Sequence, residues 1–230
     1  MMQFAKDYSV KGILKYIKIC KMKNFNNYII LENKNEIEKL LLENCQPFFK
    51  EMKGSDNIFY RCHNGSFQGD YQELKPHKNR MPRDTDKKSH EIINSLSEEK
   101  IGWGSRNAIF ATTSFETASI YDTGGLYEET GVYVFIPIGD FKYAYIPGVE
   151  DLYNVMEENP ICSFYIWSKL YHNGEKDEMI VKEWLSKRKE FLENLVDMYE
   201  TTDLKNATDV EVSFKCESYY LIELQYKDLI

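Results

Sequence analysis

The spacing of apolar residues changes between two periods along the chain, and each period predicts a different kind of element. Apolar residues recur every three or four positions, as on one face of an amphipathic helix, in four segments: residues 8–20, 35–45, 88–99 and 176–199. In the second segment Asn35 can cap the helix, and Pro47 is expected to interrupt or end it.

Shorter apolar runs bounded by turn residues predict β-strands. These runs cover residues 57–61, 109–114, 132–136, 143–146, 210–214 and 219–225. Pro137 and Gly139 are expected to end the strand at 132–136. The last two runs predict a closing hairpin joined by residues 215–218. Residues 62–88 are polar and without periodicity, which is typical of a long irregular loop.

The order of the expected elements is helices, strands, helix and strands, without regular strand–helix–strand alternation. This order predicts the α+β class, with a mostly antiparallel sheet and segregated helices. The chain is 230 residues long, enough to bury one large core. We therefore expect residues 1–52 to form an N-terminal helical extension and residues 53–230 to form the main domain.

Residues 109–121 carry the most informative pattern in the chain. An apolar strand ends in three adjacent hydroxyls, Thr112, Thr113 and Ser114, and a helix follows directly. Two interpretations stay open for this hydroxyl shelf: it caps the helix, or it contacts a polar ligand. An earlier strand ends in Arg61, which makes either an ordinary ion pair or a contact with the same ligand.

The charge balance limits the classes of partner. A formal net charge of −8 disfavours a protein whose main role is to bind a polyanion, but it is compatible with a nucleotide ligand. Residues 1–31 reverse the balance with six lysines and one aspartate, which indicates either a solvated basic face or an arm that contacts a partner. Arg80 and Arg83 flank a proline, so they are either solvated or held to address a phosphate.

Cysteine and histidine patterns favour a reduced, metal-free protein. The five cysteines are widely spaced without a C-x-x-C pair, and the four histidines lack metal-ligand spacing. No stretch approaches the roughly 20 apolar residues of a membrane span, and no secretion signal is recognised. A cytoplasmic protein without a membrane partner is expected.

Three sequence features together resemble the ADP-ribosyltransferase superfamily, in its arginine–serine–glutamate class. They are the strand-borne Arg61, the Thr112-Thr113-Ser114 strand end with Ala118 and Tyr121 on the helix behind it, and the late Asp209-Val210-Glu211. In that class the first strand carries an arginine, and the middle strand ends in Ser-Thr-Ser. A three-residue motif, in which Glu or Gln is followed by any residue and then by Glu, comes before the last hairpin. The resemblance covers roughly residues 55–225. It implies a split antiparallel sheet, a catalytic domain at 53–230 and a helical insertion at about 150–205.

The resemblance also implies that NAD is the co-substrate and that its nicotinamide–ribose bond is cleaved through an oxocarbenium-like state. Glu211 would stabilise the developing positive charge, Arg61 would hold a ribose or phosphate oxygen, and Ser114 would support that geometry. Tyr121 is a candidate to stack on the nicotinamide ring. The full set of candidate cofactor contacts is Arg61, Thr112, Thr113, Ser114, Tyr121, Arg80, Arg83 and Arg106. Of these, Arg80, Arg83 and Arg106 are the candidates for the pyrophosphate.

The chain departs from the pattern of the class at two positions. Thr112 stands where the class has its first serine, which keeps the hydroxyl. Asp209 stands where the class has Glu or Gln, a position that helps to choose the acceptor, so the acceptor stays open. The interval from the shelf to Glu211 is longer than compact members need. Glu150 and Glu217 therefore remain rivals for the catalytic carboxylate.

The sequence leads to three hypotheses about function. The first is a mono-ADP-ribosyltransferase that modifies a protein or a nucleic acid, and the second is an NAD glycohydrolase in which water replaces the acceptor. The third is a catalytically silent module that uses the same fold to bind a partner. Abundant Lys, Asn, Ile and Tyr are typical of AT-rich bacterial or phage genes. An effector or toxin acting in a host cytoplasm would fit that source.

Overall fold

The computed structural model describes residues 36–77, 87–121, 130–162 and 178–224. Its strands are β1 (Tyr60–Asn64), β2 (Tyr71–Leu74), β3 (Ile109–Thr112), β4 (Thr130–Tyr145) and β5 (Glu211–Glu223). Its α-helices include α3 (Gln46–Glu51), α4 (Lys87–Ile101), α5 (Phe115–Ile120), α6 (Leu152–Glu158) and α8 (Glu178–Asp197). Two 3₁₀ turns are η1 (Ser105–Asn107) and η2 (Leu204–Asn206).

Three helices predicted from apolar spacing are confirmed. Residues 36–44 are helical, and α4 and α8 correspond to the predicted helices at 88–99 and 176–199. Pro47 lies in the first turn of α3, where a missing N–H costs nothing, so it separates two helices. The helix predicted at 8–20 and the basic segment 1–31 lie outside the described residues.

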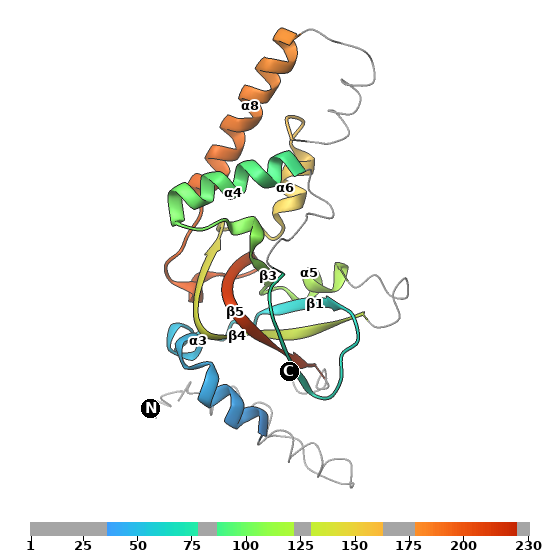
Figure 1. The fold of residues 1–230 in the computed structure, drawn as a ribbon, viewed down its shortest axis with the longest axis vertical. Coiled ribbons are helices and arrows are strands. Elements are labelled where there is room, and N and C mark those ends of the chain that lie inside the picture. Colours follow the sequence, from blue (N-terminus) through green and yellow to red (C-terminus); the bar gives the residue numbers. More distant parts are fainter. Residues whose placement is uncertain (1–35, 78–86, 122–129, 163–177, 225–230) are drawn as a thin grey trace, which may run out of the picture.

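The sheet is antiparallel throughout its recorded pairings, in the order β2-β5-β3-β1-β4. Strand β4 also pairs with β5, so the pairings of β5, β3, β1 and β4 form a ring. Helices α4, α6 and α8 gather on one side of this sheet, and α3 lies on the other (Figure 1). The chain is therefore α+β with an antiparallel sheet, as predicted.

The predicted break in β4 is wrong. The runs at 132–136 and 143–146 belong to one strand, and Pro137 remains in register with Tyr219. The pairing shifts only between Ile138 and Phe141, where Gly139 has a φ of 65°. Pro137 and Gly139 therefore lead into a β-bulge, with the glycine in the left-handed region, and the strand continues beyond it.

The predicted closing hairpin is also wrong, because β5 runs without a break from Glu211 to Glu223. Residues 215–218 contain no Gly, Pro or Asn to form a tight turn, and they stay paired with β4. Their polar character reflects exposure, since Lys215 and Glu217 face solvent. One long central strand thus takes the place of two short ones.

Strand β2 lies inside the predicted irregular segment 62–88. It pairs with the second half of β5, from Tyr71 opposite Ile222 to Leu74 opposite Tyr219. Four residues at the edge of the sheet give too short a run for a period of two to be recognised.

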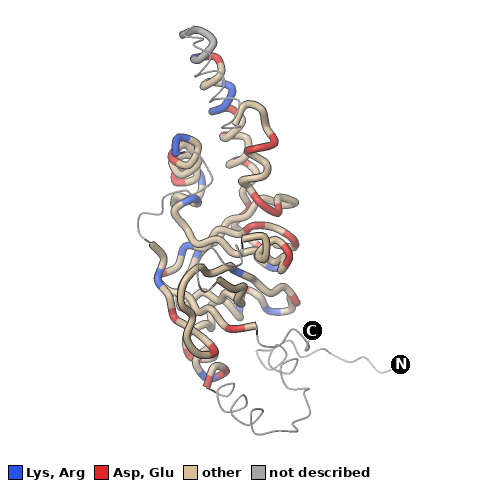
Figure 2. The backbone as a smooth tube through the Cα atoms, turned by 90° about the vertical axis from the view of Figure 1, so that its right-hand side faces the viewer, with Lys and Arg blue, Asp and Glu red and all other residues tan. Residues whose placement is uncertain are grey.

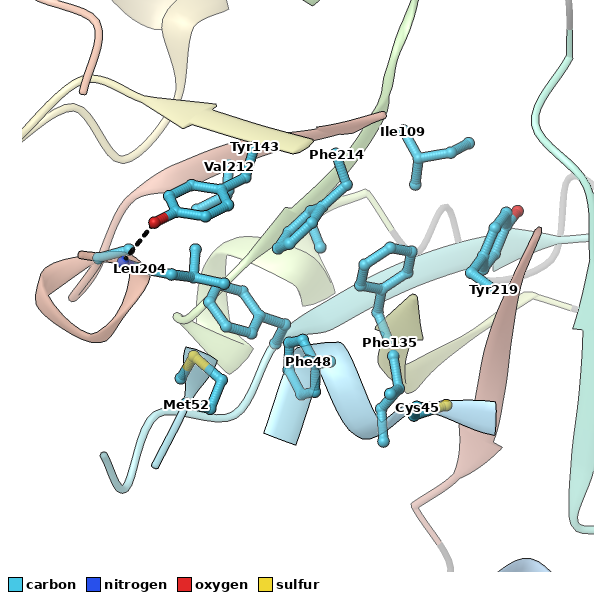
Figure 3. Packing of buried hydrophobic residues seen from close by; sticks show 14 of the residues in the cluster. Cys45, Phe48, Met52, Ile109, Phe135, Tyr143, Leu204, Val212, Phe214 and Tyr219 are labelled. Carbon is cyan, nitrogen blue, oxygen red and sulfur yellow. Dashed lines mark hydrogen bonds between the residues drawn. The ribbon is translucent and has the colours of Figure 1, made fainter. Parts of the chain in front are cut away.

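The main core lies between α3 and the sheet and is dominated by aromatic rings (Figure 3). Phe59 packs edge-to-face on Phe48 and Phe214, with ring centroids 6.0 and 5.2 Å apart. The ring centroids of Phe135 and Phe214 are 4.9 Å apart. Each fully buried ring of this size contributes about 1.5–3 kcal/mol. Part of the segment predicted as an extension joins this core, because Leu41, Cys45, Phe48 and Met52 all belong to it.

A second cluster connects the helices on the other side of the sheet. Ile93 of α4 packs there with Leu152 and Met156 of α6 and with Leu192 and Val196 of α8. This cluster gives the region predicted as an insertion, about 150–205, apolar contacts of its own. Whether it is an insertion relative to other proteins stays a prediction.

Acidic and basic positions are interspersed along the backbone in Figure 2. On α8, for example, Lys187 pairs with Glu183 at 2.8 Å and Lys189 with Glu193 at 3.3 Å, both exposed. Of the helices that are described, none has the length and apolar content to cross a bilayer. Within the same part of the chain, no group of three or more His, Cys, Asp or Glu side chains could hold a metal ion.

Candidate functional site

The hydroxyl shelf lies where β3 ends and α5 begins. Ser114 is the N-cap of α5, and its Oγ accepts hydrogen bonds from the Thr117 backbone N at 3.1 Å and the Thr117 hydroxyl at 3.0 Å. Thr112 Oγ1 accepts one from the Ser114 backbone N at 3.1 Å. The shelf thus caps the helix, the first of the two interpretations. A hydroxyl has one donor besides its two lone pairs, so capping leaves Ser114 able to donate to a ligand.

Thr113 connects the shelf to the residues before β5. Its backbone N donates to the Val210 carbonyl at 3.4 Å, and its Oγ1 accepts from the Val210 backbone N at 3.4 Å. Asp209, just before this contact, is exposed and has a φ of 50°. Asp tolerates the left-handed region better than most residues, which suits it to this turn.

Glu211 lies directly opposite Thr112 across β3 and β5. Directly opposed residues of antiparallel strands point to the same face, so the carboxylate and the hydroxyl share one face of the sheet. The Glu211 backbone N also donates to the Val149 carbonyl at 3.1 Å, which fixes the start of β5. The structure therefore brings two of the predicted site residues together.

Arg106 of η1 is the basic group next to this carboxylate. Its Nη1 lies 3.2 Å from Glu211 Oε1, and the two side chains are only 6% and 19% exposed. The guanidinium also stacks over the Phe110 ring, 4.5 Å from its centroid. The backbone N of Arg106 donates to Asn94 Oδ1 at 2.8 Å, so backbone and side chain are both held. The sequence indicated Arg106 only as one of three arginines for the pyrophosphate.

Tyr199 belongs to the same charged environment. Its hydroxyl accepts a hydrogen bond from Ser105 Oγ at 3.1 Å. Burial raises the pKa of Tyr199; Arg106 and the bond from Ser105 lower it, and Glu211 raises it further. Both members of the Arg106–Glu211 pair thus affect the pKa of this tyrosine. Sequence reasoning missed Tyr199, because a tyrosine at the end of the amphipathic segment 176–199 carries no functional signal of its own.

Arg61 lies on the other face of the sheet. Its neighbour Tyr60 is opposite Thr112, and side chains alternate along a strand, so Arg61 points away from the face of Glu211. Its Nη1 donates to the Phe110 carbonyl. Burial raises the pKa of the Tyr219 hydroxyl above its ordinary value, and the nearby positive charge of Arg61 opposes this shift. Within the described part of the chain, Arg61 Nε is buried without a hydrogen-bond partner.

Tyr121 ends α5 and contacts a buried aspartate. Its hydroxyl donates to Asp151, which is the N-cap of α6 and accepts the Tyr153 backbone N at 2.8 Å. Asp151 follows two residues after Val149, the partner of Glu211, so α5, α6 and β5 meet near one point. Sequence reasoning missed Asp151, although an aspartate before Leu-Tyr-Asn is a recognisable N-cap.

The remaining candidates are either exposed or outside the described residues. Arg80 and Arg83 belong to the latter group. The two rival carboxylates, Glu150 and Glu217, are both exposed. Glu211 is therefore the rival whose carboxylate is mostly buried and held by an arginine.

Comparison with known proteins adds no relative: no protein-family model matches the chain, and neither a curated protein nor a solved structure does.

Proposed function

We propose that the chain is an NAD-dependent mono-ADP-ribosyltransferase that moves ADP-ribose to a macromolecular acceptor and releases nicotinamide. The observation that carries the proposal is the position of Glu211 opposite Thr112, beside the Ser114 cap. A carboxylate and hydroxyls on one face of the sheet, at the adjoining ends of β3 and β5, suit a ribose. The ribose diol can donate hydrogen bonds to the carboxylate and accept them from the hydroxyls.

NAD supplies an ADP-ribosyl group joined to a good leaving group, and the chain supplies charge and orientation. In the transfer, the bond from the ribose carbon to the nicotinamide nitrogen breaks and its electron pair leaves with nicotinamide. The acceptor's lone pair forms the new bond to the ribose carbon, and the acceptor's proton is released to solvent water. In this proposal Glu211 stabilises the positive charge that develops on the ribose as the bond to nicotinamide breaks. In this proposal the Thr112 and Ser114 hydroxyls orient the sugar.

The orientation of Arg61 changes the role that the resemblance implied for it. Its guanidinium donates to the β3 carbonyl at Phe110, on the face opposite Glu211. In the proposed enzyme Arg61 supports the strand that carries the shelf. The charged partner of the carboxylate is Arg106.

One observation favours the alternative of a silent binding module. Glu211 is already in an ion pair with Arg106, and the hydroxyls of Thr112 and Ser114 already accept backbone hydrogen bonds. A site whose groups satisfy one another can be purely structural. Turnover of NAD, measured directly, separates the two functions.

The test incubates the purified protein with NAD labelled in the adenylate part, with and without a cell lysate. A transferase labels macromolecules and releases nicotinamide, whereas a glycohydrolase yields free ADP-ribose. Digestion of the labelled product with protease or nuclease then identifies the acceptor as protein or nucleic acid. Intact NAD in every reaction would refute both enzymatic functions.

Two matched variants assign the carboxylate. Glu211→Gln removes the charge from the proposed site, and Glu217→Gln does the same at an exposed position on the same strand. We expect Glu211→Gln to abolish NAD cleavage and Glu217→Gln to retain it. The reverse result would assign the catalytic role to Glu217.

A further inference from the structure

The ion pair between Arg106 and Glu211 is held from several directions. Stacking on Phe110 fixes the plane of the guanidinium, and Asn94 Oδ1 fixes the backbone of η1 through Arg106 N and Asn107 N, at 2.8 and 3.1 Å. Glu211 is fixed through its own backbone N, which donates to the Val149 carbonyl. Water has little access to either charged group, since both side chains are largely buried.

We propose that Arg106 is a positioning residue of this site, which keeps the Glu211 carboxylate ionised and aimed along the face that it shares with Thr112. The inference rests on the proposed function. It assigns to Arg106 an action through Glu211 in place of the pyrophosphate contact that the sequence indicated.

The geometry favours positioning over direct contact with a phosphate. One side of the guanidinium is covered by the Phe110 ring, and its Nη1 is directed to Glu211. Arg106 is 5% exposed as a residue, which leaves little surface for a pyrophosphate. A buried carboxylate without a cation would take up a proton more readily, because burial disfavours its charge. A protonated Glu211 could not stabilise a positive charge on the ribose.

Ionisable groups lie on several of the described elements next to Glu211. Arg106 contacts the carboxylate from η1, and Tyr199, after α8, interacts with it electrostatically. Asp209 precedes it on an exposed turn, and Asp151 lies at the start of α6 beyond Val149. His90 of α4 also lies beside η1, with its Nε2 3.2 Å from Asn107 Oδ1. Among these described groups Arg106 is the cation that contacts the carboxylate, so its removal should shift the acidic limb of the pH–rate profile.

The experiment measures kcat and KM for NAD cleavage over a range of pH in wild type, Arg106→Gln and Arg106→Lys. Arg188→Gln is the matched control. Arg188 is also a buried arginine, 3% exposed, with its guanidinium 5.0 Å from the Trp184 ring and its Nε 3.1 Å from Ser89 Oγ. It lies in α8, in the helical layer away from the shelf.

We expect Arg106→Gln to lower kcat about 100-fold with KM unchanged, since a misdirected catalytic group costs about that much. The acidic limb should move up by about one pH unit or more. Arg106→Lys should restore the position of that limb, because it keeps the charge, but only part of kcat, because it lacks the planar fork. Arg188→Gln should leave the pH profile in place.

Three results would overturn the inference. A raised KM with unchanged kcat would make Arg106 a substrate contact. A lowered kcat without a shift of the acidic limb, as in Arg188→Gln, would make it merely structural. If wild type does not cleave NAD, the proposed function fails and the inference fails with it; in the first two cases the function stands.

Discussion

Tyr143 and Leu204 are joined by a buried hydrogen bond, in which the Leu204 backbone N–H donates to the Tyr143 hydroxyl at 3.0 Å (Figure 3). The same hydroxyl donates to Glu51 Oε1 at 2.7 Å. One side chain of β4 therefore connects η2 with the end of α3. Burial, followed by the bond to Glu51, raises the pKa of Tyr143 well above its ordinary value, so the hydroxyl keeps its proton throughout the physiological range.

Tyr143→Phe should destabilise the fold by about 1–3 kcal/mol, because the Leu204 N–H stays buried without its acceptor. Denaturant unfolding measures the change. Tyr71→Phe is the control, since the Tyr71 hydroxyl donates to Glu36 at 3.3 Å in an exposed position. We expect its effect to stay within about 0.5 kcal/mol. Equal losses in the two variants would contradict the special role of Tyr143.

Ser114 can be tested separately as a cap and as a ligand contact. Ser114→Ala should cost about 1 kcal/mol, because the Thr117 N–H loses its acceptor. Ser114→Asp restores an N-cap oxygen but not a hydroxyl donor, so it should recover stability. If the hydroxyl also donates to the ribose, Ser114→Asp will remain impaired in NAD cleavage. Full activity of a stable Ser114→Asp would limit Ser114 to capping.

The sequence predicted most helices because their apolar period is long and regular, as in α4 and α8. It predicted the strand that ends in the hydroxyl shelf, and it placed Glu211 late in the chain at the start of a strand. It did not predict that β4 and β5 are continuous. Local turn signals at Pro137 and Gly139, and the polar residues 215–218, are overridden by pairing between β4 and β5 that no local window contains.

The arginines of the site show the same limit. Arg61 and Arg106 each stand near a strand in the sequence, but which face an arginine occupies depends on register with other strands. Tyr60 opposite Thr112 sends Arg61 away from Glu211. Arg106 reaches the carboxylate because Asn94, twelve residues earlier in the chain, holds the backbone of η1 against α4. Such a contact depends on tertiary packing and is not visible in a motif.

Alkaline pH should destabilise the protein through Cys45. This thiol is 0% exposed in the main core, and burial raises its pKa to about 12. In the unfolded chain the pKa of a cysteine thiol is about 8.5. Above that pH the unfolded state binds fewer protons than the folded state, so the free energy of unfolding falls as pH rises toward 12; at neutral pH this loss is absent.

Cys45→Ala removes the contribution of this thiol to the pH dependence, so comparison with wild type measures that contribution. The variant should be less stable than wild type at neutral pH, because it leaves a small cavity. The difference between the two free energies of unfolding should shrink between about pH 8 and about pH 10.5. Urea unfolding at several pH values measures it. A difference that stays constant over that range would show that the Cys45 thiol ionises as readily in the folded protein as in the unfolded chain.

Gly104 and Asn94 should be energetically coupled. A Cβ at position 104 would lie 2.8 Å from Asn94 Oδ1, too close for any real contact, although the backbone there has an ordinary extended conformation with φ −76°. Gly104→Ala therefore has to displace the oxygen that accepts from Arg106 N and Asn107 N. We expect a loss of about 1–3 kcal/mol from this overpacking.

A double-mutant cycle tests the coupling. Asn94→Ala alone should also destabilise the fold, by about 1–3 kcal/mol, because the Arg106 N–H loses its acceptor and the Asn107 N–H keeps only its 3.2 Å bond to the Gly104 carbonyl. In the Asn94→Ala background the clash is gone, so Gly104→Ala should cost much less, with a coupling energy of about 0.5–3 kcal/mol. Additive losses would show that residue 104 does not act through Asn94. Since Asn94 holds the backbone of Arg106, each single variant should also lower NAD cleavage more than its loss of stability explains.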